Sequence, residues 1–139
     1  MSVKVFVDTN VLVYAYDIDA GAKQQTAQNV LLNLWQERIG AVSMQVLQEF
    51  YSTATRKLAS PLSKQKARLI VARYVRWCVV TTPEEMKQAF RIEDDARIGV
   101  WDALIVAAAI KAGARRILSE DLSPGQIIAG VLIENPFAP

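Results

Sequence analysis

Short segments of strand character alternate with helical segments along the whole of this 139-residue chain. Residues 3–7 are mostly β-branched or aromatic, which predicts a strand that ends at Asp8. Strands that alternate with helices through short connections favour a mostly parallel sheet covered on both faces. The sequence therefore predicts an α/β fold, a three-layer α/β/α sandwich around a central sheet of about five strands. The other strands are expected at residues 41–43, 78–80, 116–119 and 130–133.

The helical segments show the matching periodicity. Apolar residues recur every three to four positions in most of them, and the segment 101–112 is apolar almost all round, so that helix should lie inside the molecule. Ser63 and Thr82 are suited to cap helices, and Thr82 precedes a proline and two acids. The helices are expected at residues 11–16 (or a turn there), 23–38, 44–58, 64–77, 83 onward and 101–112.

The chain contains no histidine and one cysteine, Cys78. Zinc sites built from thiolates and imidazoles are therefore excluded, as are Ser-His-Asp triads and histidine acid–base catalysis. A lone cysteine forms no intramolecular disulfide, which suits a reducing compartment. Any metal that this chain binds must be held by oxygen atoms.

Composition and length place the chain among ordinary globular proteins. Hydrophobic residues make up 52% and the net charge is only +2, which by itself indicates no nucleic-acid partner. The longest apolar run, residues 103–110, is far shorter than the ~20 residues of a membrane-spanning helix. We expect one soluble, cytoplasmic domain over residues 1–139.

Four carboxylates are predicted to meet at one edge of the sheet. Asp8 ends the first strand, Asp121 follows the fourth, Asp102 lies in the first turn of the apolar helix, and Glu49 lies in the helix after the second strand. In parallel α/β folds, ligands bind beyond the carboxyl ends of the strands. Taken singly, each acid has a structural explanation as a turn residue, a helix-terminal charge or a surface side chain. Only the set of four points to a site.

Like charges held together repel, and a divalent cation removes that conflict. Oxygen ligands suit Mg²⁺ or Mn²⁺. Metal-assisted hydrolysis of a phosphodiester needs no histidine, no cysteine and no side-chain nucleophile. The residues left in this chain fit that reaction.

Four short motifs, in this order along the chain, resemble those of PIN-domain endoribonucleases, of the kind found as VapC-type toxins of bacterial toxin–antitoxin pairs. The ending Asn-Pro-Phe is also similar to that of the family. The motifs are Val-Phe-Val-Asp-Thr-Asn at residues 5–10, Ser43 with Glu49, Trp-Asp-Ala-Leu-Ile at residues 101–105, and Ile-Leu-Ser-Glu-Asp at residues 117–121.

The resemblance implies a Mg²⁺- or Mn²⁺-dependent ribonuclease that acts on single-stranded RNA. It makes Asp8, Glu49, Asp102 and Asp121 the catalytic and metal-binding residues, with Asp8 and Asp102 favoured as direct ligands and Glu49 and Asp121 acting directly or through water. It also implies a homodimer and a small antitoxin partner. Supporting hydrogen bonds are expected from Asn10, Ser43 and Ser119. Gly99 stands where relatives often have serine, so the cap of the helix that carries Asp102 is expected to differ.

Basic residues between 56 and 76 occur without any acid and are candidates for RNA contact, chiefly Lys64, Arg68 and Arg73. For most of them, a solvated polar face is the somewhat better explanation. Tyr14, Tyr16, Trp35 and Trp77 could stack on bases, but their helical spacing favours core packing or a subunit interface.

Two other functions remain open. A catalytically silent PIN-like module would bind RNA or protein without turnover. Phosphoryl transfer through an aspartyl-phosphate is disfavoured, because Asn10 stands where that chemistry needs a second aspartate.

Overall fold

The computed structural model describes residues 3–138, in which six strands form one sheet in the order β3-β2-β1-β4-β6-β5. Neighbouring strands are parallel except β5 and β6. The strands are β1 (Lys4–Val7), β2 (Gly40–Ser43), β3 (Cys78–Val79), β4 (Ala114–Leu118), β5 (Ile127–Ile128) and β6 (Val131–Glu134).

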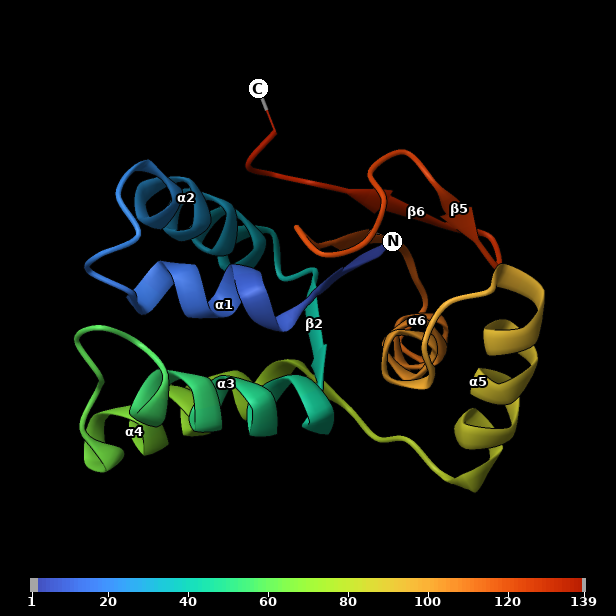
Figure 1. Ribbon diagram of the computed structural model, residues 1–139, viewed down its shortest axis with the longest axis horizontal. Coiled ribbons are helices and arrows are strands. Elements are labelled where there is room, and N and C mark those ends of the chain that lie inside the picture. The colour runs from blue at the N-terminus through green and yellow to red at the C-terminus, as the bar shows by residue number, and fades with distance from the viewer. Residues whose placement is uncertain (1–2, 139) are drawn as a thin grey trace.

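Helices cover the sheet on both sides, as the sequence predicts. In Figure 1, α1 to α4 lie on one side of β2, and α5 and α6 lie on the other. The helices of the described region are α1 (Thr9–Tyr16), α2 (Ala22–Glu37), α3 (Met44–Arg56), α4 (Lys64–Tyr74), the 3₁₀ turn η1 (Val75–Trp77), α5 (Pro83–Ala96) and α6 (Val100–Lys111). The three-layer α/β/α architecture is confirmed. No helix of residues 3–138 combines the length and the apolar character that crossing a bilayer requires.

The sheet has one strand more than the five expected. β5 contains two residues and pairs antiparallel with β6 through a tight turn at Ala129 and Gly130, both of which have positive φ. Such φ values are typical of two-residue hairpin turns. Ile127 and Ile128 show no alternation by which a strand is predicted, whereas β3, which is equally short, is predicted from the longer segment 78–80.

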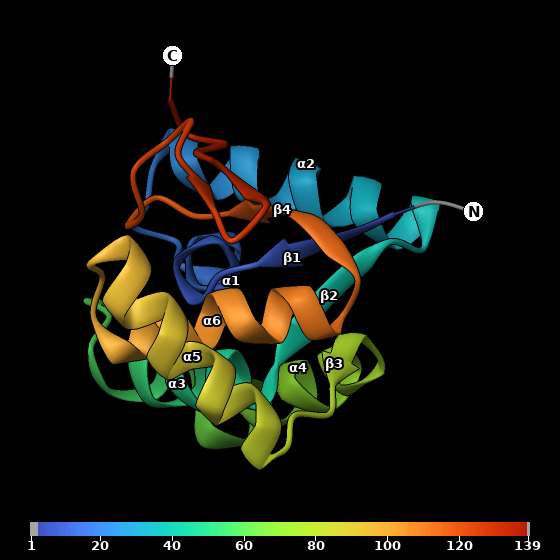
Figure 2. The same cartoon turned by 90° about the vertical axis from the view of Figure 1, so that its right-hand side faces the viewer.

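The core lies between the sheet and its helices. Phe6 and Val7 of β1 are fully buried, which is typical of a strand with helices on both faces. α6 buries Ala103, Val106 and Ala107 completely, so the prediction that this helix lies inside is confirmed. Figure 2 shows β1 and β4 side by side, with α6 packed beneath them.

Side-chain caps fix where two of the helices begin. The Ser63 side chain accepts a hydrogen bond from the backbone of Lys66, and Thr82 and Glu85 form a reciprocal capping box at the start of α5. Both caps agree with the sequence. Gly99 is the N-cap of α6 and makes no side-chain cap hydrogen bond, so this helix start lacks the cap that a serine would provide.

An aromatic cluster packs where β2 begins, at Gly40. Trp35 and Trp77 have ring centroids 4.5 Å apart, and Tyr74 packs against both. Trp77 is 7% exposed, so core packing rather than base stacking is its role. A methyl group at Gly40 would lie 2.5 Å from Cζ2 of Trp77, closer than any van der Waals contact.

Gly40→Ala should therefore destabilise the fold by about 1–3 kcal/mol, because the indole must move out of a packed cluster. The matched control is Gly99→Ala, whose added methyl group meets nothing within 4 Å. Urea unfolding followed by circular dichroism measures both variants. Equal midpoints for the two would contradict this packing.

Candidate active site

Asp8 is positioned by the pairing of β1 with β4. Val7 pairs with Leu118, and the backbone N–H of Asp8 donates to the Leu118 carbonyl at 3.0 Å. Asp8 is also the N-cap of α1, because its Oδ1 accepts a 2.8 Å hydrogen bond from the Thr9 backbone. The carboxyl group is thus held where β1 ends, beside the turn that follows β4.

Hydrogen bonds join Asp8 to Asp121 through two of the predicted supporting residues. The Ser119 hydroxyl donates to Asp8 Oδ2 at 2.7 Å and accepts from the Asp121 backbone at 3.1 Å. Asn10 Nδ2 donates to Asp121 Oδ2 at 3.1 Å, and Asn10 Oδ1 accepts from the Glu120 backbone. Residues more than 100 positions apart in the sequence therefore share one polar network.

Burial raises the pKa of Asp8 to about 6. Hydrogen bonds from Ser119 and Thr9 lower the pKa, and the negative charges of Asp121 and Glu49 raise it further. The pKa of Asp102 is also raised, by burial and by the charge of Asp121. Each of the four predicted acids therefore acts electrostatically on at least one other.

The four acids lie at one end of the sheet, but their side chains do not surround a single point. Glu49 and Asp121 are exposed and line, with Asn10, a hollow of about 300 Å³ between α1 and α3. Asp102 is half-buried in the first turn of α6. Within residues 3–138, no three carboxylate, imidazole or thiol side chains stand close enough to make a ready-built metal site.

A divalent cation fits this donor set as a water-rich ion. Mg²⁺ is commonly held by one or two carboxylates together with water and substrate phosphate. The donors present are carboxylate, amide and hydroxyl oxygens, which hard cations prefer. Among the described residues, Thr9 Oγ1 beside Asp8 is a buried polar atom with no hydrogen-bond partner. The chemistry of the residues therefore suits Mg²⁺ or Mn²⁺.

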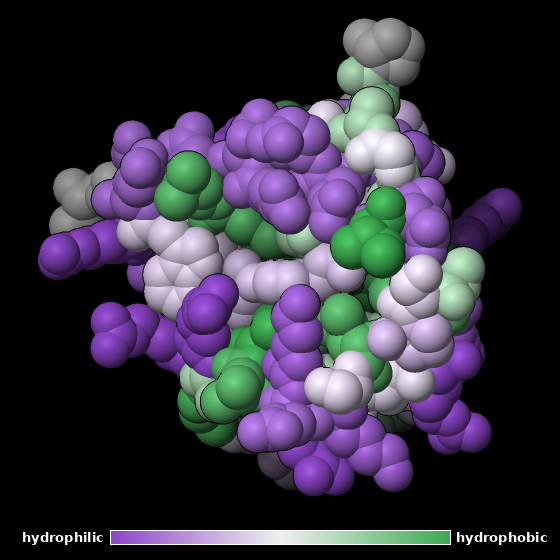
Figure 3. All heavy atoms as spheres, turned by 90° about the vertical axis from the view of Figure 1, so that its left-hand side faces the viewer, coloured by the Kyte–Doolittle hydropathy of each residue, from purple (hydrophilic) through white to green (hydrophobic). Residues whose placement is uncertain are grey.

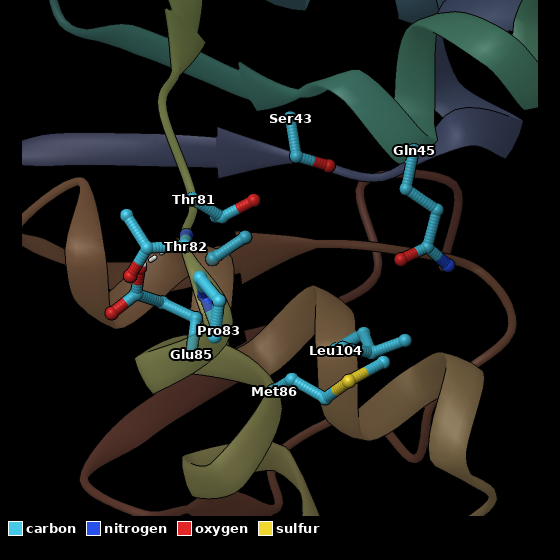
Figure 4. Close-up of a pocket in the computed structure, with 9 residues that line it drawn as sticks. Ser43, Gln45, Thr81, Thr82, Pro83, Glu85, Met86 and Leu104 are labelled. Atoms are coloured by element: carbon cyan, nitrogen blue, oxygen red, sulfur yellow. Dashed lines mark hydrogen bonds between the residues drawn. The ribbon is translucent and has the colours of Figure 1, made fainter.

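Ser43 forms its hydrogen bond within α3 and not with the four carboxylates. Its hydroxyl accepts from the Val46 backbone at 3.3 Å and so caps α3. Figure 4 shows Ser43 on a neighbouring pocket with Thr81 and Leu104. The contribution of Ser43 to this site is to fix the start of the helix that carries Glu49.

A second polar cluster, not found from the sequence, supports the turn after β4. Tyr14 donates a 2.6 Å hydrogen bond to Glu120, which also forms an ion pair with Lys23. The Lys23 ammonium lies 5.0 Å from the centre of the Tyr14 ring. Tyr14 and Lys23 lie about 100 residues before Glu120 in the sequence, and no local sequence pattern predicts that they pair with it.

The predicted RNA-contact residues Lys64, Arg68 and Arg73 are all exposed on α4, which packs against α3. The Arg68 guanidinium lies 5.9 Å from the centre of the Tyr51 ring. Figure 3 views the end of the molecule that carries α4 and the α1–α2 turn, where hydrophilic side chains project around exposed hydrophobic ones. Contact of these cations with RNA stays a prediction.

Comparisons with known proteins agree with this architecture. The profile of the PIN domain family matches residues 5–124. No curated protein sequence matches significantly. A toxin–antitoxin complex from Klebsiella pneumoniae is similar in structure, with a TM-score of 0.71 and 16% identity over 96% of this chain and 98% of that chain.

Two further solved structures are similar. DNA-bound VapBC from Salmonella typhimurium has a TM-score of 0.69 and 18% identity, over 97% of this chain and 99% of that chain. VapC20 from Mycobacterium tuberculosis, a sarcin-ricin loop cleaving toxin, has a TM-score of 0.60 and 22% identity, over 85% and 90%. At these identities the similarity establishes the fold.

Asp8→Asn should stabilise the metal-free protein at neutral pH. The pKa of Asp8 is raised to about 6 in the fold, so the folded state binds its proton more tightly than the unfolded chain does. This group's contribution to stability is therefore greatest below pH ~4 and is lost as the pH rises through ~6. The variant should gain about 2–3 kcal/mol over wild type at pH 7.5, and little at pH 4.

Chemical unfolding in EDTA across this pH range measures the difference. Asp94→Asn, which removes an exposed carboxylate from α5, is the control and should show a nearly flat difference. A difference between Asp8→Asn and wild type that does not change with pH would contradict the burial of an ionisable Asp8.

Proposed function

The chain belongs to the PIN domain family, and we propose that it is a metal-dependent endoribonuclease that hydrolyses phosphodiester bonds of single-stranded RNA. One observation carries the proposal. Asp8 is only 7% exposed, is hydrogen-bonded to Ser119, and lies within electrostatic reach of Asp121 and Glu49. Burying a carboxylate among other carboxylates destabilises the metal-free fold. A bound cation relieves that repulsion, and the relief favours binding of the cation.

Asp8 and Asp102 would hold Mg²⁺ or Mn²⁺ directly, and Glu49 and Asp121 would hold it directly or through water. The bound cation would supply an acidified water and neutralise charge on the phosphate that is cleaved. Ser119 orients the carboxyl group of Asp8, and Asn10 orients that of Asp121. Such hydrogen bonds to ligand oxygens tune metal sites.

The environment of Asp8 sets the pH at which its carboxyl group loses its proton. Its pKa of about 6 leaves the carboxyl group mostly charged above pH 7 and mostly neutral below pH 5. Ligands must be deprotonated to bind a cation. Binding of the cation to the metal-free protein is therefore expected to weaken as the pH falls below about 6.

Partners and location follow from the same proposal. We assign residues 1–139 to a single nuclease domain that works in the cytoplasm as a homodimer. Similarity to toxin–antitoxin complexes from Klebsiella and Salmonella supports a small antitoxin as the partner. Similarity to a toxin that cleaves the sarcin-ricin loop supports RNA as the substrate.

The cations of α4 would guide the substrate. Lys64, Arg68 and Arg73 are exposed on a helix that packs against α3, the helix that carries Glu49. Positive side chains beside a negatively charged site would offset the repulsion between its carboxylates and RNA phosphates. This contribution to binding would weaken as salt is raised.

Cleavage of mixed single-stranded RNA should require Mg²⁺ or Mn²⁺ and stop in excess EDTA. Asp102→Asn should lower the rate at least about 100-fold, because a metal ligand is lost while its half-buried position tolerates the isosteric amide. Gel analysis of labelled RNA measures the rate, and circular dichroism verifies the fold.

The Asp94→Asn variant should cleave at the wild-type rate. Undiminished cleavage by Asp102→Asn, or in EDTA, would contradict the proposal. RNA binding without any turnover of the wild type in Mn²⁺ would instead identify a catalytically silent module.

A further inference from the structure

Trp101 is the most exposed aromatic side chain near the acids. It directly precedes Asp102 in the first turn of α6, and 70% of its surface is exposed. By contrast, Trp77 is buried and packs against Trp35. Leaving an indole in water forgoes the free energy that burial would provide. Neither the core nor the caps of this fold explain why a tryptophan occupies the position.

A hollow of about 430 Å³ lies against this side chain, lined by Gln45, Gln48, Glu49 and Trp101. Gln45 Nε2 donates to the Trp101 carbonyl oxygen at 3.2 Å, which ties the start of α3 to the start of α6. Figure 4 shows Gln45 reaching from α3 toward α6. The two walls of the hollow are therefore fixed relative to each other.

The hollow borders the proposed active site at Glu49. Glu49 lines it and also lines the hollow that contains Asn10 and Asp121. Trp101 itself is adjacent to Asp102 in the sequence. A strand of RNA whose cleaved phosphate lies at the acids would therefore place a neighbouring nucleotide here.

The side chains that line the hollow favour binding of the base of that nucleotide over binding of its phosphate. Among residues 3–138, no basic side chain lines the hollow, and the Glu49 carboxylate would repel a phosphate. An uncharged base offers a face to an indole and hydrogen-bonding edges to amides. Gln48 is exposed and lines the hollow, so its amide can present a donor and an acceptor to such an edge.

We propose that this hollow binds one unpaired nucleobase of the substrate, stacked on Trp101 and contacted at its edge by Gln48, next to the phosphate that is cleaved. The position of the cleaved bond rests on the proposed nuclease function. Binding of the base is a separate property of Trp101 and can be measured without cleavage.

The test uses Asp8→Asn protein in EDTA, so that RNA is bound and not cut. A short unstructured fluorescein-labelled RNA is titrated, and anisotropy is followed. Trp101→Ala should weaken binding about tenfold, and Trp101→Phe should stay within about threefold of the parent because it keeps an aromatic face. The control is Leu32→Ala on α2, which removes another exposed apolar side chain (57% exposed) and should change nothing.

Homopolymer RNAs separate stacking from recognition of the base edge. Trp101→Ala should weaken binding to all of them, whereas Gln48→Ala should change their order of affinity. In the active protein, Trp101→Ala should raise KM with kcat within about threefold, since the acids are untouched.

Equal RNA affinities of Trp101→Ala and Leu32→Ala would overturn the inference. A change in sedimentation on Trp101→Ala without a change in RNA binding would also overturn it, by identifying a protein contact. If wild-type protein binds RNA through Trp101 yet never cleaves it in Mn²⁺, the nuclease proposal fails and this one stands. If cleavage is normal but Trp101→Ala binds normally, only this inference fails.

Discussion

The parallel register between β1 and β4 is the constraint on which the site depends. Pairing of Val7 with Leu118 sets Asp8 beside Ser119, at 2.7 Å between the carboxylate and hydroxyl oxygens. A slip of one residue would exchange the two faces of β1 and carry Asp8 away from that hydroxyl. Phe6 and Val7 are fully buried, so the register is fixed by packing on both faces of the sheet. The hydrophobic core thereby decides where the chemistry is placed.

The site combines one buried acid with more hydrated ones. Burial of Asp8 works against its ionisation and raises its pKa, whereas Glu49 and Asp121 remain exposed at the rim. A buried carboxylate has few alternative partners and a fixed orientation, while exposed ones can rearrange around an ion and its waters. Asp8 therefore offers the ion a ligand of fixed orientation, and Glu49 and Asp121 offer ligands that can move. The burial of Asp8 lowers the stability of the metal-free fold.

Periodicity and topology predicted most of the fold and much of the site. Helix caps at Ser63 and Thr82, the buried α6 and the carboxyl-end position of Asp8 all follow from local patterns that the structure keeps. β5 was not predicted, because it is defined by its pairing with β6 across the turn at Ala129 and Gly130 and not by a pattern along its own two residues. Other features depend on contacts that no local window contains, such as the pairing of Glu120 with Lys23. An all-apolar helix predicts burial throughout, and Trp101 departs from it because the first turn of α6 reaches past the edge of the core.

The central claim is that these carboxylates hold a divalent cation at the carboxyl end of the sheet. Anomalous diffraction from crystals soaked in Mn²⁺ tests it most directly, because the ion is located without reference to activity. The account predicts a manganese peak within about 2–2.5 Å of an oxygen of Asp8 and of an oxygen of Asp102, with Glu49 and Asp121 joined to it directly or through water. Manganese bound only at other surfaces, with none beside Asp8, would contradict it.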